Sequence, residues 1–166
     1  MEAITVRDLL TAVGGTLIGP ETSLDRTVSS VDTDSRDIHP GSLFLPLVGE
    51  RFDGHTYIGS ALEAGAAGCL TAREPEHYQE GRFYIKVEDT QRALRDLAFW
   101  YKEQFRIPFV GVTGSVGKTT AKDMIASVLS VKYKVLKTEG NFNNNVGLPL
   151  TLLRLDRSVQ IGVVEM

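Results

Sequence analysis

The segment from Phe109 to Thr120 constrains the fold of this chain more than any other, because it places a short strand, a glycine loop and a helix start in direct succession. It reads Phe-Val-Gly-Val-Thr-Gly-Ser-Val-Gly-Lys-Thr-Thr. Glycines let the backbone turn so that successive N–H groups point at one phosphate. The helix N-terminus adds a partial positive charge. The segment therefore predicts a site for nucleotide phosphates.

Two side chains of this segment carry the expected chemistry. Lys118 can reach the terminal phosphates, and the Thr119 hydroxyl can bind Mg²⁺. The usual spacing places a glycine five positions before Gly117, where this chain has Val112. The alternative is an ordinary strand-to-helix turn, which the Gly-Lys-Thr-Thr ending disfavours. The motif alone does not say what the nucleotide does, because kinases, GTPases and ligases share it.

The residues around the loop predict the start of a parallel-sheet domain. We expect strands at 109–112, 134–137 and 159–165 and helices at 118–131 and 148–153. Strands that alternate with helices pair in parallel through right-handed crossovers. The apolar runs at 109–112 and 159–164 are typical of strands buried on both faces. With only three strands, some apolar surface and a sheet edge should remain open.

A smaller α/β domain precedes this one. Thr5 and Asp8 are spaced as the capping box of a helix that ends before Gly14. We expect strands at 28–33, 42–46, 68–71 and 83–87 and helices at 57–64 and 90–105. Arg106-Ile-Pro108 interrupts the helical pattern, so the predicted domains are 1–106 and 107–166.

Composition excludes several classes of protein. The net charge of −3 argues against nucleic-acid binding driven by bulk charge. The single Cys69 cannot form an internal disulfide, which fits a reducing compartment. No apolar run is long enough to cross a bilayer, and the N-terminus does not read as a signal peptide. We expect a cytoplasmic protein without membrane insertion.

The shorter loop Thr113–Thr120 resembles that of the Mur ligases, the ATP-dependent amide-bond formers of peptidoglycan synthesis. Further motifs agree with the family in order and spacing: Asp34-Ser-Arg36, Pro40-Gly-Ser-Leu-Phe44, Gly49-Glu-Arg-Phe-Asp-Gly-His55 and Ala64-Gly-Ala66. Gly140-Asn-Phe-Asn-Asn-Asn-Val-Gly-Leu-Pro149 followed by Thr151-Leu-Leu-Arg-Leu155 resembles the MurF-type branch, which joins D-alanyl-D-alanine to a UDP-MurNAc-tripeptide.

The resemblance implies three sets of site residues. The ATP-binding set is Thr113, Gly114, Ser115, Val116, Gly117, Lys118, Thr119 and Thr120, with Lys118 catalytic. The set for the UDP-substrate is Ser35, Arg36, Glu50, Arg51, Phe52, Asn141, Asn143 and Asn144. The metal ligands are Thr119 and Glu165, whose carboxylate ends an apolar strand and suits Mg²⁺. Without the family, the Asp-Ser-Arg turn is more typical of a solvated turn than of a binding site, and the asparagines are typical of loops as well.

The resemblance also implies a reaction. A substrate carboxylate attacks the γ-phosphate of ATP, and the amine of the dipeptide displaces phosphate from the resulting acyl phosphate. Lys118, the loop N–H groups and Mg²⁺ would stabilise charge on the transferring group. Related ligases have three domains, so the chain reads as an N-terminal fragment, inactive alone, of an enzyme that is monomeric at full length.

Two other functions remain open at this stage. One is a Mur-type ligase that adds a single amino acid, although its loop is usually rich in threonine rather than asparagine. The other is a stand-alone P-loop nucleotide-binding module. His39, His55 and His77 lack metal-ligand spacing. His55 lies in the Asp-Gly-His turn, where we expect a structural role or a place beside the UDP.

Overall fold

The structure, a computed structural model, describes residues 1–75, 77–140 and 144–166. The chain divides into two compact units, residues 3–97 and residues 1–2 with 98–166. In the described part of the chain, no helix has the length and apolar character needed to span a membrane. Both units are mixed α/β, and parallel strand pairs occur in each. The predicted fold class is therefore confirmed.

The unit of residues 3–97 contains a five-stranded sheet in the order β2-β7-β6-β5-β4. The parallel strands β4 to β7 all end at the same edge, and β2 pairs antiparallel to β7. A two-stranded sheet pairs β1 with β3. The elements are β1 Ile4–Thr5, α1 Val6–Val13, β2 Thr16–Ile18, η1 Glu21–Asp25, β3 Thr27–Val28, β4 Val31–Asp32, β5 Leu43–Phe44, η2 Gly54–Tyr57, α2 Ile58–Glu63, β6 Gly68–Thr71, β7 Phe83–Lys86 and α3 Thr90–Glu103, which continues into the other unit.

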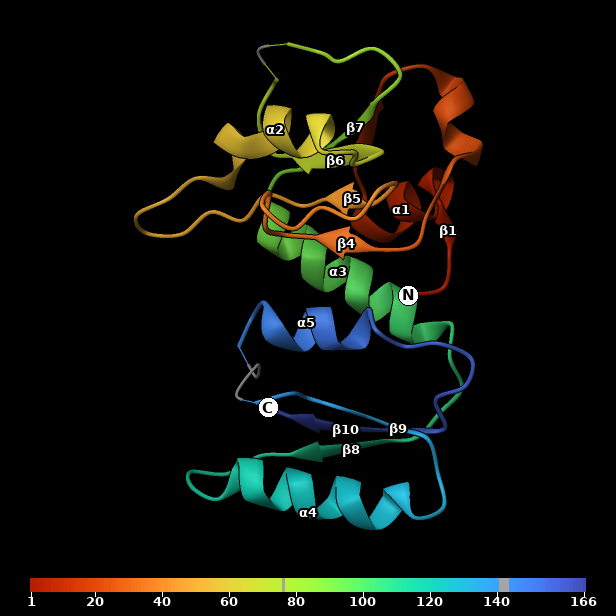
Figure 1. Ribbon diagram of the computed structural model, residues 1–166, viewed down its shortest axis with the longest axis vertical. Helices are drawn as coiled ribbons and strands as arrows, with labels where there is room; N and C mark the ends of the chain where they lie inside the picture. Colours follow the sequence, from red (N-terminus) through yellow and green to blue (C-terminus); the bar gives the residue numbers. More distant parts are fainter. Residues whose placement is uncertain (76, 141–143) are drawn as a thin grey trace. The chain divides into compact units, whose positions relative to one another are not determined.

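Side chains that alternate in direction along these strands are buried on both faces of the sheet. Phe44, Cys69 and Tyr84 form one cluster with α2, which lies over that face in Figure 1. Leu43, the neighbour of Phe44 that alternation directs to the opposite face, is fully buried as well. Burial raises the pKa of the Cys69 thiol to about 12, so this thiol is an inert part of the core.

The second unit is built on a three-stranded parallel sheet in the order β8-β10-β9. Figure 1 shows α4 on one side of this sheet and α5 on the other. The close approach of the Phe109 ring to Gly162 fixes the spacing of β8 and β10, because a Cβ at Gly162 would lie 2.3 Å from that ring. The elements are β8 Phe109–Val112, α4 Lys118–Ser130, β9 Val135–Lys137, α5 Gly147–Leu152 and β10 Ile161–Glu165.

Most predicted elements are present, and the differences have physical reasons. The capping box is confirmed, since Asp8 N donates to Thr5 Oγ1 at 3.1 Å and Thr5 N donates to Asp8 Oδ2 at 3.0 Å. The β structure expected over 28–33 is present but divided between two short strands, β3 and β4, which belong to different sheets. An open sheet edge, as expected from three strands, lies at β8, which stays partly exposed in the described sheet, whereas central β10 is buried from Gly162 to Glu165.

Candidate functional site

The phosphate loop has the geometry that its glycines suggest. The backbone leaves β8 at Val112 and enters α4 at Lys118. Gly114 and Gly117 have φ angles of 152° and 75°, values that side-chain-bearing residues rarely adopt. The Lys118 side chain lies back over the loop, with its Cγ 3.8 Å from a Cβ built at Gly114. Lysine and helix N-terminus therefore converge on one loop, as phosphate binding requires.

The two predicted metal ligands are brought together. Thr119 Oγ1 donates to Glu165 Oε2 at 2.9 Å, although the residues are 46 positions apart. Glu165 ends the central strand and lies in register with Val112, the last residue before the loop. Its side chain is 2% exposed. A hydroxyl and a carboxylate side by side at the carboxyl edge of a parallel sheet form a hard oxygen donor pair, which fits Mg²⁺.

The end of β9 completes this edge of the sheet. Thr138 is fully buried, and its Oγ1 accepts from the backbone N–H of Glu165 at 3.1 Å. One turn into α4, Lys122 is 1% exposed and donates to the carbonyl of Gly140 at 3.1 Å. Its Nζ also lies 3.6 Å from the Asp123 carboxylate. These contacts tie the β9 loop both to the central strand and to the helix that follows the phosphate loop.

Sequence reasoning missed Thr138 and Lys122. In the sequence, a threonine after a strand and a lysine within a helix both resemble ordinary surface residues. Only the order of the strands in the sheet brings Thr138 and Lys122 to the edge at which Glu165 lies. Among the described residues, no three His, Cys, Asp or Glu side chains gather as a metal cluster.

In the other unit, the Asp34-Ser-Arg36 turn follows β4. The Arg36 guanidinium donates two hydrogen bonds to the Asp34 carboxylate, from Nη2 to Oδ2 at 2.6 Å and from Nε to Oδ1 at 2.9 Å. These bonds lower the pKa of Asp34 to about 2. Ser35 is half-buried beside it. A ligand phosphate would compete with Asp34 for this guanidinium.

The residues Glu50, Arg51 and Phe52 lie at the tip of a tight hairpin after β5. Val48 and Asp53 form an antiparallel bridge at its base. The Gly49 N–H donates to the Phe52 carbonyl at 3.0 Å. All three tip residues are exposed. Since β4 and β5 are neighbouring parallel strands, this hairpin and the Asp-Ser-Arg turn leave the same edge of the sheet.

The asparagine segment is only partly described. Asn141 and Asn143, both expected at the substrate, lie outside the described residues. Asn144 Oδ1 accepts from the N–H groups of Val146 at 3.1 Å and Gly147 at 2.7 Å. This oxygen thus holds the start of α5.

Two protein-family models match the chain. One, described as the Mur ligase middle domain, matches residues 112–166. The other, described as the Mur ligase family catalytic domain, matches residues 27–101. Each match falls on one of the two sets of motifs described above.

Curated relatives match along nearly the whole chain. The UDP-N-acetylmuramoyl-tripeptide–D-alanyl-D-alanine ligase of Bacillus subtilis (strain 168) is 45% identical over 162 residues, which cover 98% of this chain and 35% of the relative. The enzyme of the same name from Escherichia coli (strain K12) is 39% identical over 166 residues, 100% of this chain and 35% of the relative. The chain thus spans about a third of the length of the relatives it matches.

Solved structures of MurF ligases are similar to this chain in fold. A crystal structure of MurF from Acinetobacter baumannii superposes with a TM-score of 0.89 at 34% identity, covering 100% of this chain and 36% of that one. MurF ligase from Thermotoga maritima in complex with ADP superposes with a TM-score of 0.75 at 36% identity, covering 82% of this chain and 31% of that one.

Proposed function

Since the chain belongs to the Mur ligase family, we propose that it is the substrate-binding and phosphate-binding part of a MurF-type ligase. The proposed reaction joins D-alanyl-D-alanine to a UDP-MurNAc-tripeptide with hydrolysis of ATP. Two of the relatives named above are ligases for those substrates, and one structural neighbour holds ADP. The observation that carries the proposal is the Thr119–Glu165 pair, 2.9 Å apart and next to the phosphate loop.

The phosphate-binding residues divide the work by position. The N–H groups from Thr113 to Thr120 and the Lys118 ammonium would bind the β- and γ-phosphates. Thr119 and Glu165 would hold Mg²⁺, which lowers the cost of charge on the transferring group. Both groups are fixed before any ligand arrives: Glu165 by its place in β10, and Thr119 by the first turn of α4. Such preorganisation is the main source of electrostatic catalysis.

The UDP end of the substrate would lie on the unit of residues 3–97. Arg36 and Arg51 supply positive charge for the diphosphate, Ser35 supplies a hydroxyl, and exposed Phe52 supplies a flat surface for uracil. Glu50 would accept from a sugar hydroxyl. Asn141, Asn143 and Asn144 would meet the sugar and peptide, since an amide both donates and accepts.

In the proposed reaction, the substrate carboxylate attacks the γ-phosphorus of ATP and ADP leaves. The amine of the dipeptide then attacks the acyl carbon and loses a proton, and inorganic phosphate leaves. A carboxylate is a poor acylating group at neutral pH, so phosphorylation supplies the leaving group. The residues of this chain would orient the γ-phosphate for attack by the carboxylate and neutralise the charge of that phosphate. We place the activity in the cytoplasm, because that compartment supplies ATP and keeps a free thiol such as the buried Cys69 reduced.

The test is calorimetric titration of the 166-residue chain with UDP-MurNAc-tripeptide, UDP-MurNAc-dipeptide and Mg-ATP. A MurF-type protein should bind the tripeptide form more tightly than the dipeptide form, because only the former is its substrate. Preference for the dipeptide form would instead indicate a ligase that adds a single amino acid. Binding of Mg-ATP without either UDP compound would leave only a nucleotide-binding module and contradict the proposal.

A further inference from the structure

The hairpin that carries Glu50, Arg51 and Phe52 depends on its base for its orientation. Besides the Val48–Asp53 bridge, the Gly54 N–H donates to the Leu47 carbonyl at 2.8 Å. The Gln91 side chain, from the start of α3, donates to the Val48 carbonyl at 3.5 Å. The first two contacts join the two sides of the hairpin, and the Gln91 bond joins the hairpin to α3.

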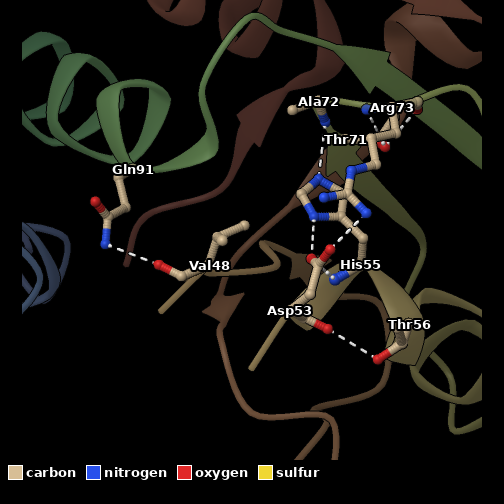
Figure 2. A network of polar contacts seen from close by, with 8 residues as sticks. All are labelled: Val48, Asp53, His55, Thr56, Thr71, Ala72, Arg73 and Gln91. Atoms are coloured by element: carbon tan, nitrogen blue, oxygen red, sulfur yellow. Dashed lines mark hydrogen bonds and ion pairs between the residues drawn. The ribbon is translucent and has the colours of Figure 1, made fainter. Parts of the chain in front are cut away.

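Asp53 connects this base to the end of β6. Its carboxylate accepts from the backbone N–H of His55 at 3.0 Å and lies 2.7 Å from His55 Nδ1. It also pairs with Arg73 at 2.5 Å. Figure 2 shows the His55 ring between Asp53 on one side and the backbone of Ala72 on the other. The ring thus bridges the hairpin and the end of β6, and the Asp53–Arg73 ion pair joins the same two segments.

The partners of the two ring nitrogens determine the protonation state of His55. Nε2 lies 3.0 Å from the backbone nitrogen of Ala72. A backbone N–H can only donate, so Nε2 must accept and carries no proton. The ring proton is therefore on Nδ1, where it is donated to Asp53. The side chain is 7% exposed, which leaves little room for water to replace either partner.

We propose that neutral His55 is a positioning residue for UDP-substrate binding, because it fastens the hairpin of residues 48–53 to the end of β6. The inference rests on the proposed function, which places the substrate at the hairpin tip. Protonation of Nε2 would set an N–H against the Ala72 N–H and break this link, while the charged ring stayed with Asp53. Acid would then loosen the hairpin from the sheet and weaken substrate binding.

Charged groups on each neighbouring element act on this ring. Asp53, on the hairpin, favours a positive ring. Arg73, after β6, opposes it, although its side chain is 65% exposed. His55 also lines a cavity of about 440 Å³ together with Arg73, Glu74 and His77. Glu74 is itself paired with Lys86 at 2.9 Å, which reduces its effect on the ring.

Three variants separate positioning from mere folding. The carbonyl of His55→Gln reaches the place of Nε2 and can accept from Ala72, but it does not titrate. The amide of His55→Asn reaches the place of Nδ1 and restores only the bond to Asp53. His55→Phe fills the space and restores neither bond. Each is titrated with UDP-MurNAc-tripeptide at about pH 7.5 and about pH 5.5, on either side of the ordinary histidine range.

We expect the affinity of the unmodified chain to fall about fivefold to tenfold at the lower pH, as the loss of one buried hydrogen bond implies. His55→Gln should recover most of the affinity and lose the pH dependence. His55→Asn and His55→Phe should be weak at both pH values. ¹⁵N spectra of the unmodified ring should show protonated Nδ1 and bare Nε2.

Other outcomes identify which idea fails. If the unmodified chain binds the substrate at neither pH, the proposed function is wrong and the inference falls with it. If it binds, but His55→Asn matches His55→Gln at neutral pH, the substrate site stands and His55 does not position it. A ring protonated on Nε2 at neutral pH would overturn the inference whatever the affinities.

Discussion

Replacing Glu165 with glutamine tests the metal site with a change of one atom. The glutamine oxygen can still accept from Thr119 Oγ1, so the 2.9 Å hydrogen bond remains but loses its charge. That weakening costs about 1 kcal/mol. Glu165 is 2% exposed, and removing a buried carboxylate recovers desolvation free energy of at least comparable size. Without ligand, the free energy of unfolding should therefore stay the same or rise.

With ligand, the same variant should lose stability relative to the unmodified chain. At a Mg-ATP concentration of about 100 times Kd, binding adds about 2.7 kcal/mol to the free energy of unfolding. Loss of a metal contact weakens binding by about 100-fold, on the scale of changes around metal sites. The same ligand concentration then adds only about 0.4 kcal/mol. Urea unfolding of unmodified chain and variant, each with and without Mg-ATP, measures all four values.

The control is Glu139→Gln, because Glu139 lies near the same edge of the sheet but is 61% exposed and paired with Arg154. It should keep the full stabilisation by Mg-ATP. If Glu165→Gln keeps it too, Glu165 does not hold the metal. If Glu165→Gln is strongly destabilised without ligand, the carboxylate serves the fold rather than the nucleotide, and the reasoning is refuted.

Three further changes test the structure around the sites. Tyr101→Phe should lower stability by about 1–3 kcal/mol, because the buried hydroxyl donates to the Leu155 carbonyl at 2.7 Å and no other donor replaces it. Gly162→Ala should cost about 1–3 kcal/mol by overpacking, since the new Cβ would lie 2.3 Å from a neighbouring ring. The hydrogen bond to Asp32 raises the pKa of His39. The contribution of the His39–Asp32 pair to the free energy of unfolding should thus be complete at acid pH and be lost as the pH rises through the raised pKa. Unfolding of the unmodified chain and of His39→Gln over a range of pH values measures this contribution.

Matched controls make these three predictions refutable. Tyr133→Phe alters a ring that is 39% exposed and should change little. Gly59→Ala has no atom within 4 Å of its new Cβ and lies inside α2, so it should stabilise by about 0.5–1 kcal/mol. Equal effects at Gly162 and Gly59, or at Tyr101 and Tyr133, would contradict the packing described. A contribution of His39 that grows with pH would contradict the Asp32 pair.

The phosphate loop was predictable because its chemistry is local. Five consecutive residues make the turn, and the helix follows at once, so no distant segment decides its geometry. The same locality explains why the Thr5–Asp8 capping box was found. Glu165 was assigned only through family resemblance, because its partner Thr119 lies 46 positions away.

The remainder depends on long-range pairing that a single sequence does not display. Strand β10 lies between β8 and β9, and this order alone makes Thr138 a neighbour of Glu165. The role of His55 depends on a backbone N–H 17 residues away, at Ala72, which any residue type would supply. The strands β1 and β2 have two and three residues, too few for a period to emerge.

We propose that this chain holds two separable sites, one for nucleotide phosphates and one for a UDP-linked substrate. Lys118→Ala tests it directly in paired calorimetric titrations, with Lys132→Ala as a control that keeps the loop intact. Loss of a charge-assisted bond to phosphate should weaken Mg-ATP binding about tenfold to 150-fold. The affinity for UDP-MurNAc-tripeptide should stay as it is in the control. Undiminished Mg-ATP binding by Lys118→Ala, or equal loss of both ligands, would contradict the account.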